Sequence, residues 1–341
     1  MKALVYEGNQ TLTVKETDIP RIERGEVLIR VRFAGICGTD MLIWKDGLAR
    51  VKPPVVIGHE FSGVVEAAGS LESSFKPGDR VVVEPLLSCG NCKACRMGAY
   101  NVCQKFRLLG IDADGAMAAY VKAPEHRLFR IPEGMSFEDA AFVEPLAVGV
   151  HMVRQSGIGN GQVALVTGGG PIGLIAACVA KLKGATVYIS EINPFRIRMA
   201  EQLGFRTINP NEERAAERIY ADTGGGGADA AFEATGTAAG LADCIAACGP
   251  KGTVVIAGLP KRKPEVDVYE IVAKELNVVG SRVYRSEDFK EALKLIQDGQ
   301  FHPGIFISRV VSLEEAVEQG FKSIERGDPV MKILIRMDDG D

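Results

Sequence analysis

Hydrophobic and polar residues alternate with a period of two in the first part of the chain, between turns rich in glycine and proline. Within residues 26–33, for example, Val27, Ile29, Val31 and Phe33 alternate with Arg30 and Arg32. This period is typical of β-strands that bury one face. We therefore expect an all-β or barrel-like domain over about the first 150 residues, with strands at 26–33, 61–66 and 80–83.

The pattern changes near Gly161, where short apolar runs begin to alternate with longer stretches of helical character. Alternation of strand and helix favours right-handed βαβ units and a parallel sheet. From about Val283 the chain returns to mixed helix and strand. The expected strands are 163–166, 185–190, 228–233, 253–257, 277–280 and 332–336, and the expected helices include 171–183, 194–203 and one that ends near 248.

Length and charge narrow the function classes. The 341 residues suit two domains, and a net charge of −4 does not favour a nucleic acid or an anionic membrane as partner. The N-terminus becomes acidic too early for a signal peptide, and the most apolar run, 172–180, is too short to span a membrane. We therefore expect a cytoplasmic protein.

A glycine-rich turn follows the first strand of the second part. Residues 168–173 read Gly-Gly-Gly-Pro-Ile-Gly and fit the pattern G-x-G-x-x-G between an expected strand and an expected helix. In that context Gly168, Gly170 and Gly173 let the backbone approach a pyrophosphate, which the helix N-terminus attracts, and Pro171 suits the first helical position. Ile172 completes the motif. The alternative is an ordinary βαβ turn without a ligand.

An acidic residue ends the next expected strand. Glu191 follows 185–190, at the distance from the glycine motif where a carboxylate accepts hydrogen bonds from the adenosine ribose. A carboxylate there repels a 2′-phosphate, so NAD is favoured over NADP. Arg196, five residues further along, is placed to stack on the adenine or to touch the ribose. The alternative for Glu191 is a solvent-facing side chain.

Four of the eight cysteines lie within fifteen residues, spaced as Cys89-x2-Cys92-x2-Cys95-x7-Cys103. Four thiolates at this spacing close around one tetrahedral zinc ion without a distant residue. A closed site of that kind stabilises a loop and performs no chemistry. The competing interpretations are an iron–sulfur cluster and four free thiols.

Three further segments contain the ligand types of a catalytic zinc. They are Gly35-Ile36-Cys37-Gly38-Thr39-Asp40, Gly58-His59-Glu60 and the segment that begins Glu144-Pro145-Leu146. Each is a weak signal alone, because a single cysteine or histidine is usually structural. Together they offer a thiolate, an imidazole and carboxylates, enough for three protein ligands and an open fourth position. A zinc ion so held makes an alcohol easier to deprotonate, and hydride then passes to a nicotinamide.

These motifs together resemble the zinc-containing medium-chain dehydrogenases/reductases, the alcohol dehydrogenase superfamily, over nearly the whole chain. Glu144-Pro145-Leu146 resembles the sorbitol and polyol dehydrogenases, whereas classical alcohol dehydrogenases carry a second cysteine at that position. Cys37-Gly38-Thr39-Asp40 is similar to both the polyol and the threonine dehydrogenases. The resemblance implies an α/β protein in which a Rossmann doubly wound parallel sheet is inserted into a GroES-like β-barrel. The implied parts are a catalytic domain at 1–149, an NAD-binding domain at 150–283 and a return to the catalytic domain at 284–341.

The resemblance also implies residue roles. Cys37 and His59 match zinc ligands, Glu60 matches a carboxylate that binds zinc directly or after ligand exchange, and Glu144 matches a ligand that in polyol enzymes holds the zinc-bound water instead. Thr39 matches the hydroxyl that passes on the substrate proton. Asp40 matches the partner that orients the His59 ring. Leu42 is a departure from the family, because many members have a histidine at that position to end the proton relay.

The expected function is zinc-dependent transfer of hydride from a secondary alcohol, of polyol or sugar type, to NAD. One catalytic and one structural zinc ion per chain are implied, with a homodimer or homotetramer as the assembly. Alternatives are an L-threonine or 2,3-diol dehydrogenase of the same family, a zinc-free quinone or enoyl reductase, and a non-catalytic NAD-binding protein. Trp44, Ile43, Arg282 and Arg285 are weak candidates for substrate contact, and His151 is a weak candidate for the relay.

Overall fold

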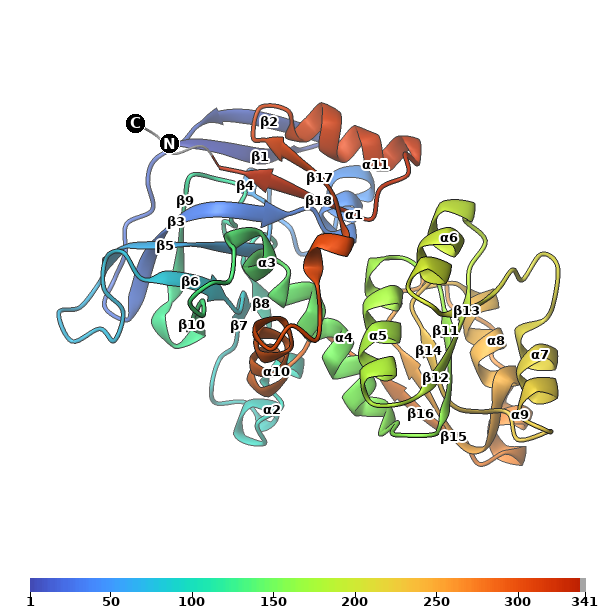
Figure 1. Cartoon of the computed structure of the whole chain (residues 1–341). Coiled ribbons are helices and arrows are strands. Elements are labelled where there is room, and N and C mark those ends of the chain that lie inside the picture. The colour runs from blue at the N-terminus through green and yellow to red at the C-terminus, as the bar shows by residue number, and fades with distance from the viewer. Residues whose placement is uncertain (338–341) are drawn as a thin grey trace. The chain divides into compact units, whose positions relative to one another are not determined.

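The computed structural model describes residues 1–337 as two compact units, one formed by 1–144 with 292 onward and the other by 145–291 (Figure 1). The first unit is therefore discontinuous in sequence. The divisions fall inside two helices, α4 (Val143–Ser156) and α10 (Ser286–Gln297), rather than in loops. No helix among the described residues has the length and apolar character needed to span a bilayer.

The first unit is built on a largely antiparallel sheet of seven strands in the order β10-β6-β5-β3-β18-β17, with β9 also paired to β3. The expected strand at 26–33 is the long central β3, which buries alternate residues. Three strands form a second sheet in the order β2-β1-β4. The strands of the unit are β1 (Lys2–Gly8), β2 (Thr11–Glu16), β3 (Glu26–Gly35), β4 (Val55–Val56), β5 (Glu60–Ala68), β6 (Arg80–Val83), β7 (Leu86–Leu87), β8 (Arg107–Leu108), β9 (Tyr120–Pro124), β10 (Leu128–Arg130), β17 (Ile307–Ser312) and β18 (Lys332–Arg336).

Short helices join these strands. The first, α1, follows β3 directly, and a π-helical segment at Ala316–Phe321 precedes the last short helix. Trp44 of α1 donates a hydrogen bond from Nε1 to the carbonyl of Gln10 at 2.7 Å and packs edge-on against Phe321. Ile43 and Trp44 are both buried, so they are core residues of this unit. Its helices are α1 (Gly38–Asp46), α2 (Lys93–Arg96), α3 (Phe137–Ala141), α11 (Lys322–Arg326) and the 3-10 turns Tyr100–Val102, Glu125–Arg127 and Pro303–Ile305.

The second unit is a six-stranded parallel sheet in the order β13-β12-β11-β14-β15-β16. Strand order reverses at β11, which lies between β12 and β14, as in a doubly wound sheet. The strands are β11 (Val163–Thr167), β12 (Thr186–Ser190), β13 (Arg206–Ile208), β14 (Ala228–Glu233), β15 (Cys248–Ile256) and β16 (Asn277–Gly280); the helices are α5 (Pro171–Leu182), α6 (Pro194–Gln202), α7 (Ala215–Asp222), α8 (Ala238–Ala247) and α9 (Val268–Ala273).

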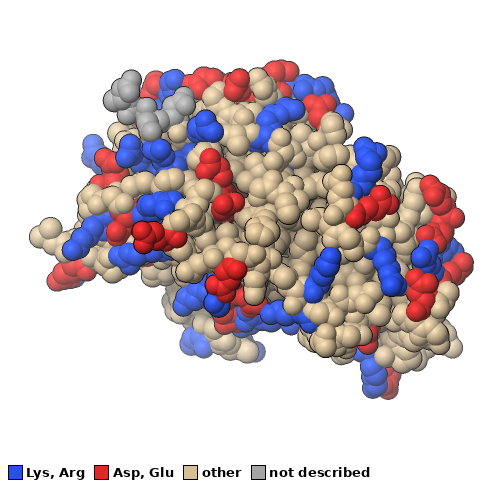
Figure 2. Space-filling model, in the orientation of Figure 1, with Lys and Arg blue, Asp and Glu red and all other residues tan. Residues whose placement is uncertain are grey.

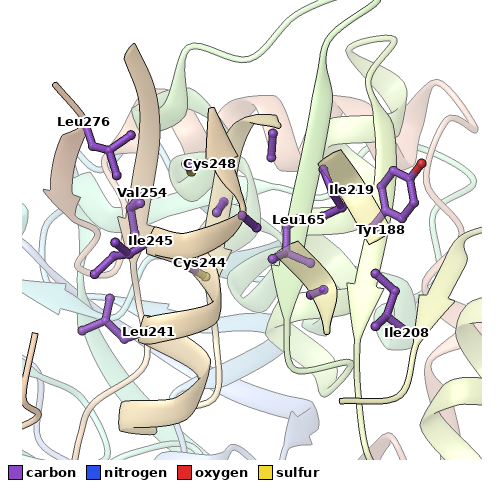
Figure 3. Close-up of a cluster of buried hydrophobic side chains, with 14 residues drawn as sticks. Leu165, Tyr188, Ile208, Ile219, Leu241, Cys244, Ile245, Cys248, Val254 and Leu276 are labelled. Carbon is purple, nitrogen blue, oxygen red and sulfur yellow. The ribbon is translucent and has the colours of Figure 1, made fainter. Parts of the chain in front are cut away.

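Buried aliphatic side chains join this sheet to helices α7 and α8 (Figure 3). Leu165 and Val254 contribute from the sheet, and Ile219 and Ile245 contribute from the helices. Burial of apolar area at about 25 cal/mol per Å² is the main term that holds such layers together. The sheet is thus a rigid support for the loops at the carboxyl ends of its strands, where the glycine motif lies.

Candidate active site and metal centres

The backbone register brings Cys37, His59 and Glu60 together at one end of the antiparallel sheet. Strands β3 and β5 are paired so that Gly35 lies opposite Glu60. Cys37 comes two residues after Gly35 as the N-cap of α1, and His59 immediately precedes β5. One ligand atom of each of the three side chains lies within 4.8 Å of the other two. His59 and Glu60 are buried and Cys37 is half-buried.

The group is suited to a cation. Burial disfavours the imidazolium, but the neighbouring Cys37 and Asp40 outweigh burial and hold the pKa of His59 well above its usual range. Glu144, the second residue of α4, adds a smaller effect of the same sign, although it lies outside the group of three. A thiolate, an imidazole and a carboxylate within this distance match the donor set of a catalytic zinc.

Asp40 lies next to the imidazole ring of His59. Its Oδ2 accepts a hydrogen bond from the backbone N–H of Cys37 at 2.8 Å, while its Oδ1 is 3.7 Å from Nδ1 of His59. Within residues 1–337, neither Oδ1 nor Nδ1 has a hydrogen-bond partner, although both are buried. A small approach would satisfy both atoms and orient the imidazole, as carboxylates do for metal-bound histidines. Thr39 lies beside Asp40 in the first turn of α1 and is half-buried.

Lys332 is a site residue that the sequence did not reveal. It begins β18 and its Nζ donates to both carboxylate oxygens of Glu60, at 2.8 and 2.7 Å. Burial opposes the charge, but Glu60 and Cys37 outweigh burial and raise the pKa of Lys332, so the side chain stays an ammonium. A lysine at the start of a C-terminal strand normally faces solvent. No local pattern therefore signals this contact.

The four clustered cysteines form a second group, in the loop that contains α2. Their Sγ atoms lie 3.5 Å apart for Cys92–Cys95 and Cys89–Cys103, 3.9 Å for Cys92–Cys103 and 4.0 Å for Cys89–Cys95. Four sulfurs about 2.3 Å from a central zinc ion would be roughly 3.8 Å apart. None of the four cysteines forms a disulfide. The observed spacings fit one tetrahedral ion.

A buried ion pair holds this loop, the cysteine lobe (residues 89–103), against the sheet. Glu84, directly after β6, accepts hydrogen bonds at Oε1 from Arg127 at 2.8 Å and from the hydroxyl of Tyr100 at 2.6 Å. Tyr100 belongs to the lobe, and Arg127 also donates to Ser88 at 3.1 Å. Burial and the adjacent Glu84 raise the pKa of Tyr100, so its hydroxyl remains a donor. The lobe is therefore fixed by polar contacts as well as by its cysteines.

In the second unit, the glycine motif forms the turn between β11 and α5. Gly170 is the N-cap of α5 and Pro171 its first residue, followed by Ile172 and Gly173. A Cβ at Gly173 would lie 1.9 Å from the carbonyl oxygen of Gly168, so only glycine allows the turn to pack this closely. The first backbone N–H groups of α5 are left without helical partners, as in anion sites at helix N-termini.

Glu191 and Arg196 lie at this turn. Glu191 is buried after β12, and its Oε2 accepts the N–H of Gly169 at 2.8 Å. Its Oε1 accepts the N–H groups of Ile192 and Asn193. Arg196 Nη1 is 3.7 Å from Glu191 Oε2, and its side chain is partly exposed. The carboxylate is thus anchored beside the glycine motif, as a ribose-binding residue requires.

His151 and Arg285, candidates for the proton relay and for substrate contact, pair with acidic side chains. His151 is buried and its Nδ1 lies 2.8 Å from Oδ2 of Asp288, which joins α4 to α10. Arg285 Nη2 pairs with Glu287 at 2.7 Å. These interactions support the structure of the second unit.

Comparison with known proteins places the chain in a family. Residues 23–133 match the model of the alcohol dehydrogenase GroES-like domain, and residues 171–298 match the model of the zinc-binding dehydrogenase domain. Over 336 residues the chain is 37% identical to 2-dehydro-3-deoxy-L-galactonate 5-dehydrogenase of Pseudoalteromonas atlantica, covering 98% of each protein. It is 35% identical to D-xylulose reductase A of Aspergillus niger, covering 98% of this chain and 97% of the relative.

The fold agrees with that assignment. The crystal structure of 2R,3R-butanediol dehydrogenase from Bacillus subtilis superposes with a TM-score of 0.92 at 34% identity, over 98% of this chain and 99% of that one. The expected combination of a GroES-like domain and a Rossmann-type sheet is confirmed. The chain belongs to the zinc-containing medium-chain dehydrogenase/reductase family, the alcohol dehydrogenase superfamily.

Proposed function

We propose that this protein is a zinc-dependent dehydrogenase that transfers hydride from a secondary alcohol of a polyol or sugar-derived substrate to NAD. The observation that carries the proposal is the approach of Cys37, His59 and Glu60 to within 4.8 Å of one another in a largely buried site. The names of the relatives, which act on a deoxy-galactonate and on xylulose, support the substrate class. The similarity to a butanediol dehydrogenase keeps 2,3-diols as a second class.

In this proposal each residue of the catalytic site has its own role. Cys37 and His59 hold the zinc ion, with Glu60 or Glu144 as the further carboxylate, and Asp40 fixes the orientation of the His59 ring. Zinc, when bound, supplies a Lewis acid that lowers the pKa of the alcohol. Thr39 accepts the alcohol proton at its hydroxyl and passes it on. Because residue 42 is a leucine, the proton leaves through the cofactor ribose, water or another group.

The other proposed site residues bind the cofactor and the second metal. Gly168, Gly170, Pro171, Ile172 and Gly173 receive the pyrophosphate of NAD, and Glu191 receives the ribose hydroxyls. Arg196 lies beside Glu191 on the exposed side, where it contacts the adenosine. A structural zinc ion belongs to Cys89, Cys92, Cys95 and Cys103. We also propose the domain limits 1–149, 150–283 and 284–341 for the catalytic, NAD-binding and returning segments.

The activity test is NADH formation at 340 nm with a panel of polyols, sugar acids, diols and threonine. We expect one substrate class to be oxidised with NAD, and we expect a strong zinc chelator to abolish the reaction. A fully zinc-loaded protein that oxidises none of these alcohols would contradict the proposal. Alcohol oxidation that survives complete removal of zinc would contradict the proposed role of the metal.

The assignment of Glu191 has its own test. We expect Glu191→Ala to raise the KM for NAD and to reduce the preference for NAD over NADP by about tenfold, because a repulsive carboxylate near the 2′-phosphate is removed. The measurement is kcat/KM for both cofactors at saturating alcohol. Glu201→Ala, on the exposed end of α6, is the matched control. Unchanged selectivity in Glu191→Ala would show that the ribose lies elsewhere.

Assembly and location complete the proposal. We propose a homodimer or homotetramer, supported by the exposed apolar side chains of Val268, Tyr269 and Val272 on α9 and of Val278 on the edge strand β16. Exposed apolar groups beside an unpaired strand edge favour association. We propose a cytoplasmic location because eight free cysteines suit a reducing compartment. Figure 2 shows basic and acidic residues mixed with one another, mainly towards the edges of the visible face.

A further inference from the structure

Glu60 is paired with a buried lysine as well as lying at the proposed metal site. The ammonium of Lys332 contacts both of its carboxylate oxygens, at 2.8 and 2.7 Å, and also donates to the carbonyl of Ile36 at 3.2 Å. Glu60 is 1% exposed and Lys332 is 4% exposed, so water does not screen the pair. Lys332 therefore connects Glu60 to the backbone immediately before Cys37.

Three neighbouring strands create this contact. In the sheet, β3 lies between β5 and β18, and Gly35 of β3 is paired with Glu60 on one side and Leu334 on the other. A Cβ at Gly35 would lie 2.2 Å from Oε2 of Glu60. The absence of a side chain at Gly35 thus opens the space that the carboxylate occupies when it is paired with Lys332.

The same carboxylate is within ligand distance of the other two donors. One oxygen of Glu60 lies within 4.8 Å of the ligand atoms of Cys37 and His59. Both oxygens also accept hydrogen bonds from Lys332, so the ammonium reduces the negative charge that Glu60 can offer to a metal. A cation on each side competes for one negative charge at short range.

We propose that Lys332 is a positioning residue that keeps Glu60 an exchangeable ligand of the catalytic metal, so that a coordination position stays accessible to the alcohol. This inference rests on the proposed function, since it presumes a metal at Cys37 and His59. Loss of the ammonium would leave the metal as the counterion of Glu60 among the buried groups that the structure describes. Glu60 would then become a permanent ligand, the metal would bind more tightly, and substrate access would decrease.

The test uses cobalt(II) at the catalytic position, with zinc retained in the cysteine lobe of the full-length protein. Cobalt affinity and visible absorption are measured without alcohol for the wild type and for Lys332→Met, with Cys37→Ser as the spectral control for the lobe. We expect Lys332→Met to bind cobalt about tenfold more tightly, the scale on which groups behind metal ligands act. We also expect weaker d–d bands, because the coordination number rises.

Two further variants distinguish an effect of Lys332 through Glu60 from a direct effect of its charge on the metal. Lys332→Arg, which keeps the cation, should restore the wild-type spectrum and affinity. In a Glu60→Gln background, Lys332→Met should change neither quantity, because no carboxylate remains to be released. An equal tightening in that background would mean that the charge of Lys332 acts directly on the metal, and would overturn the inference. So would an unchanged spectrum in Lys332→Met.

If Lys332→Met does not fold, Lys332→Gln is measured in its place, since the amide keeps a donor without the charge. We expect the same change in spectrum, smaller in size. The wild type provides the separate check on the proposed function. Cobalt that binds in a Cys37-dependent manner, with equal spectra in all Lys332 variants, would overturn the role of Lys332 alone. Failure of Cys37→Ser to alter cobalt binding would overturn the metal centre itself.

Discussion

The two candidate metal centres of the first unit are built in opposite ways. The cysteine lobe takes all four ligands from residues 89–103, and three of its four cysteines are half-buried. The other centre takes its ligands from the N-cap of α1, just after β3, and from the start of β5, next to a buried carboxylate and a buried lysine. A local, all-sulfur group suits a closed structural site, whereas a mixed group assembled by the sheet suits a site that exchanges ligands.

The largest expected effect is a loss of activity when a ligand of the catalytic centre is removed. We expect Cys37→Ala to lower kcat by about a thousandfold or more, because the metal that activates the alcohol loses a ligand. NADH binding, followed by fluorescence, should persist because the cofactor residues lie in the other unit. Cys178→Ala, a cysteine of α5 outside both metal groups, is the control and should retain activity. Appreciable turnover in Cys37→Ala would break the comparison.

For the stability of the protein we expect the opposite: a change in the cysteine lobe should lower it while leaving the chemistry largely intact. We expect Cys89→Ser to lower the thermal midpoint by about 8 °C, because loss of a structural metal costs about 4 kcal/mol and a chain of this size shifts by roughly 2 °C per kcal/mol. The kcat of the fraction that remains folded should change less than about threefold, since the lobe does no chemistry. Calorimetry and active-site titration provide the two measurements. A collapse of kcat without a change in midpoint would reverse the two assignments.

Thiol reactivity sharpens the description of the lobe. In the metal-free protein, backbone N–H donors, chiefly that of Cys95, lower the pKa of Cys92 to about 6, whereas burial raises the pKa of Cys95 to about 11. At pH 7.5 Cys92 is then mostly thiolate and Cys95 mostly thiol. Iodoacetamide should label Cys92 first, and its labelling should fall as the pH drops through 6. Mass spectrometry gives the order; equal rates would contradict it, and added zinc should protect both residues.

The smallest effect concerns how the lobe is attached. Tyr100→Phe removes the hydrogen bond from the lobe to Glu84 but leaves the four cysteines and Arg127 in place. We expect a loss of about 1.5 kcal/mol, the usual value for a hydrogen bond to a charged group, and a faster release of zinc to a chelator. Tyr120→Phe, on β9, is the matched control. An unchanged release rate would show that the cysteines alone fix the lobe.

The same contrast explains which parts of the site the sequence predicts. The ligand spacing of the lobe is entirely local, so its four residues can be identified without any knowledge of the fold. The catalytic group is not local: its separate segments offer suitable ligand types, and the family resemblance assigns a role to each. Lys332 gives no signal at all, because it reaches Glu60, 272 residues away in sequence, through the pairing of β18 with β3. Register between distant strands cannot be derived from the hydrophobic pattern of either strand alone.

For the fold, periodic segments are predicted best. The expected strand at 80–83 matches β6, and the expected helix at 171–183 ends one residue beyond α5. Short elements give less signal, as with β13, whose three residues show no periodicity. Ile43 and Trp44 illustrate a different limit: an apolar residue beside a site can belong either to a pocket or to the core, and only packing decides between them.

The position of β18 has a consequence for how the protein is made. This strand follows every strand of the second unit in sequence, yet it lies beside β3 and supplies the counterion of Glu60. During synthesis the parallel sheet of the second unit can fold as soon as β16 has left the ribosome. The neighbourhood of Cys37 cannot be completed until β18 has also been synthesised. A nascent chain will therefore acquire a nucleotide-binding unit before it acquires a finished metal centre.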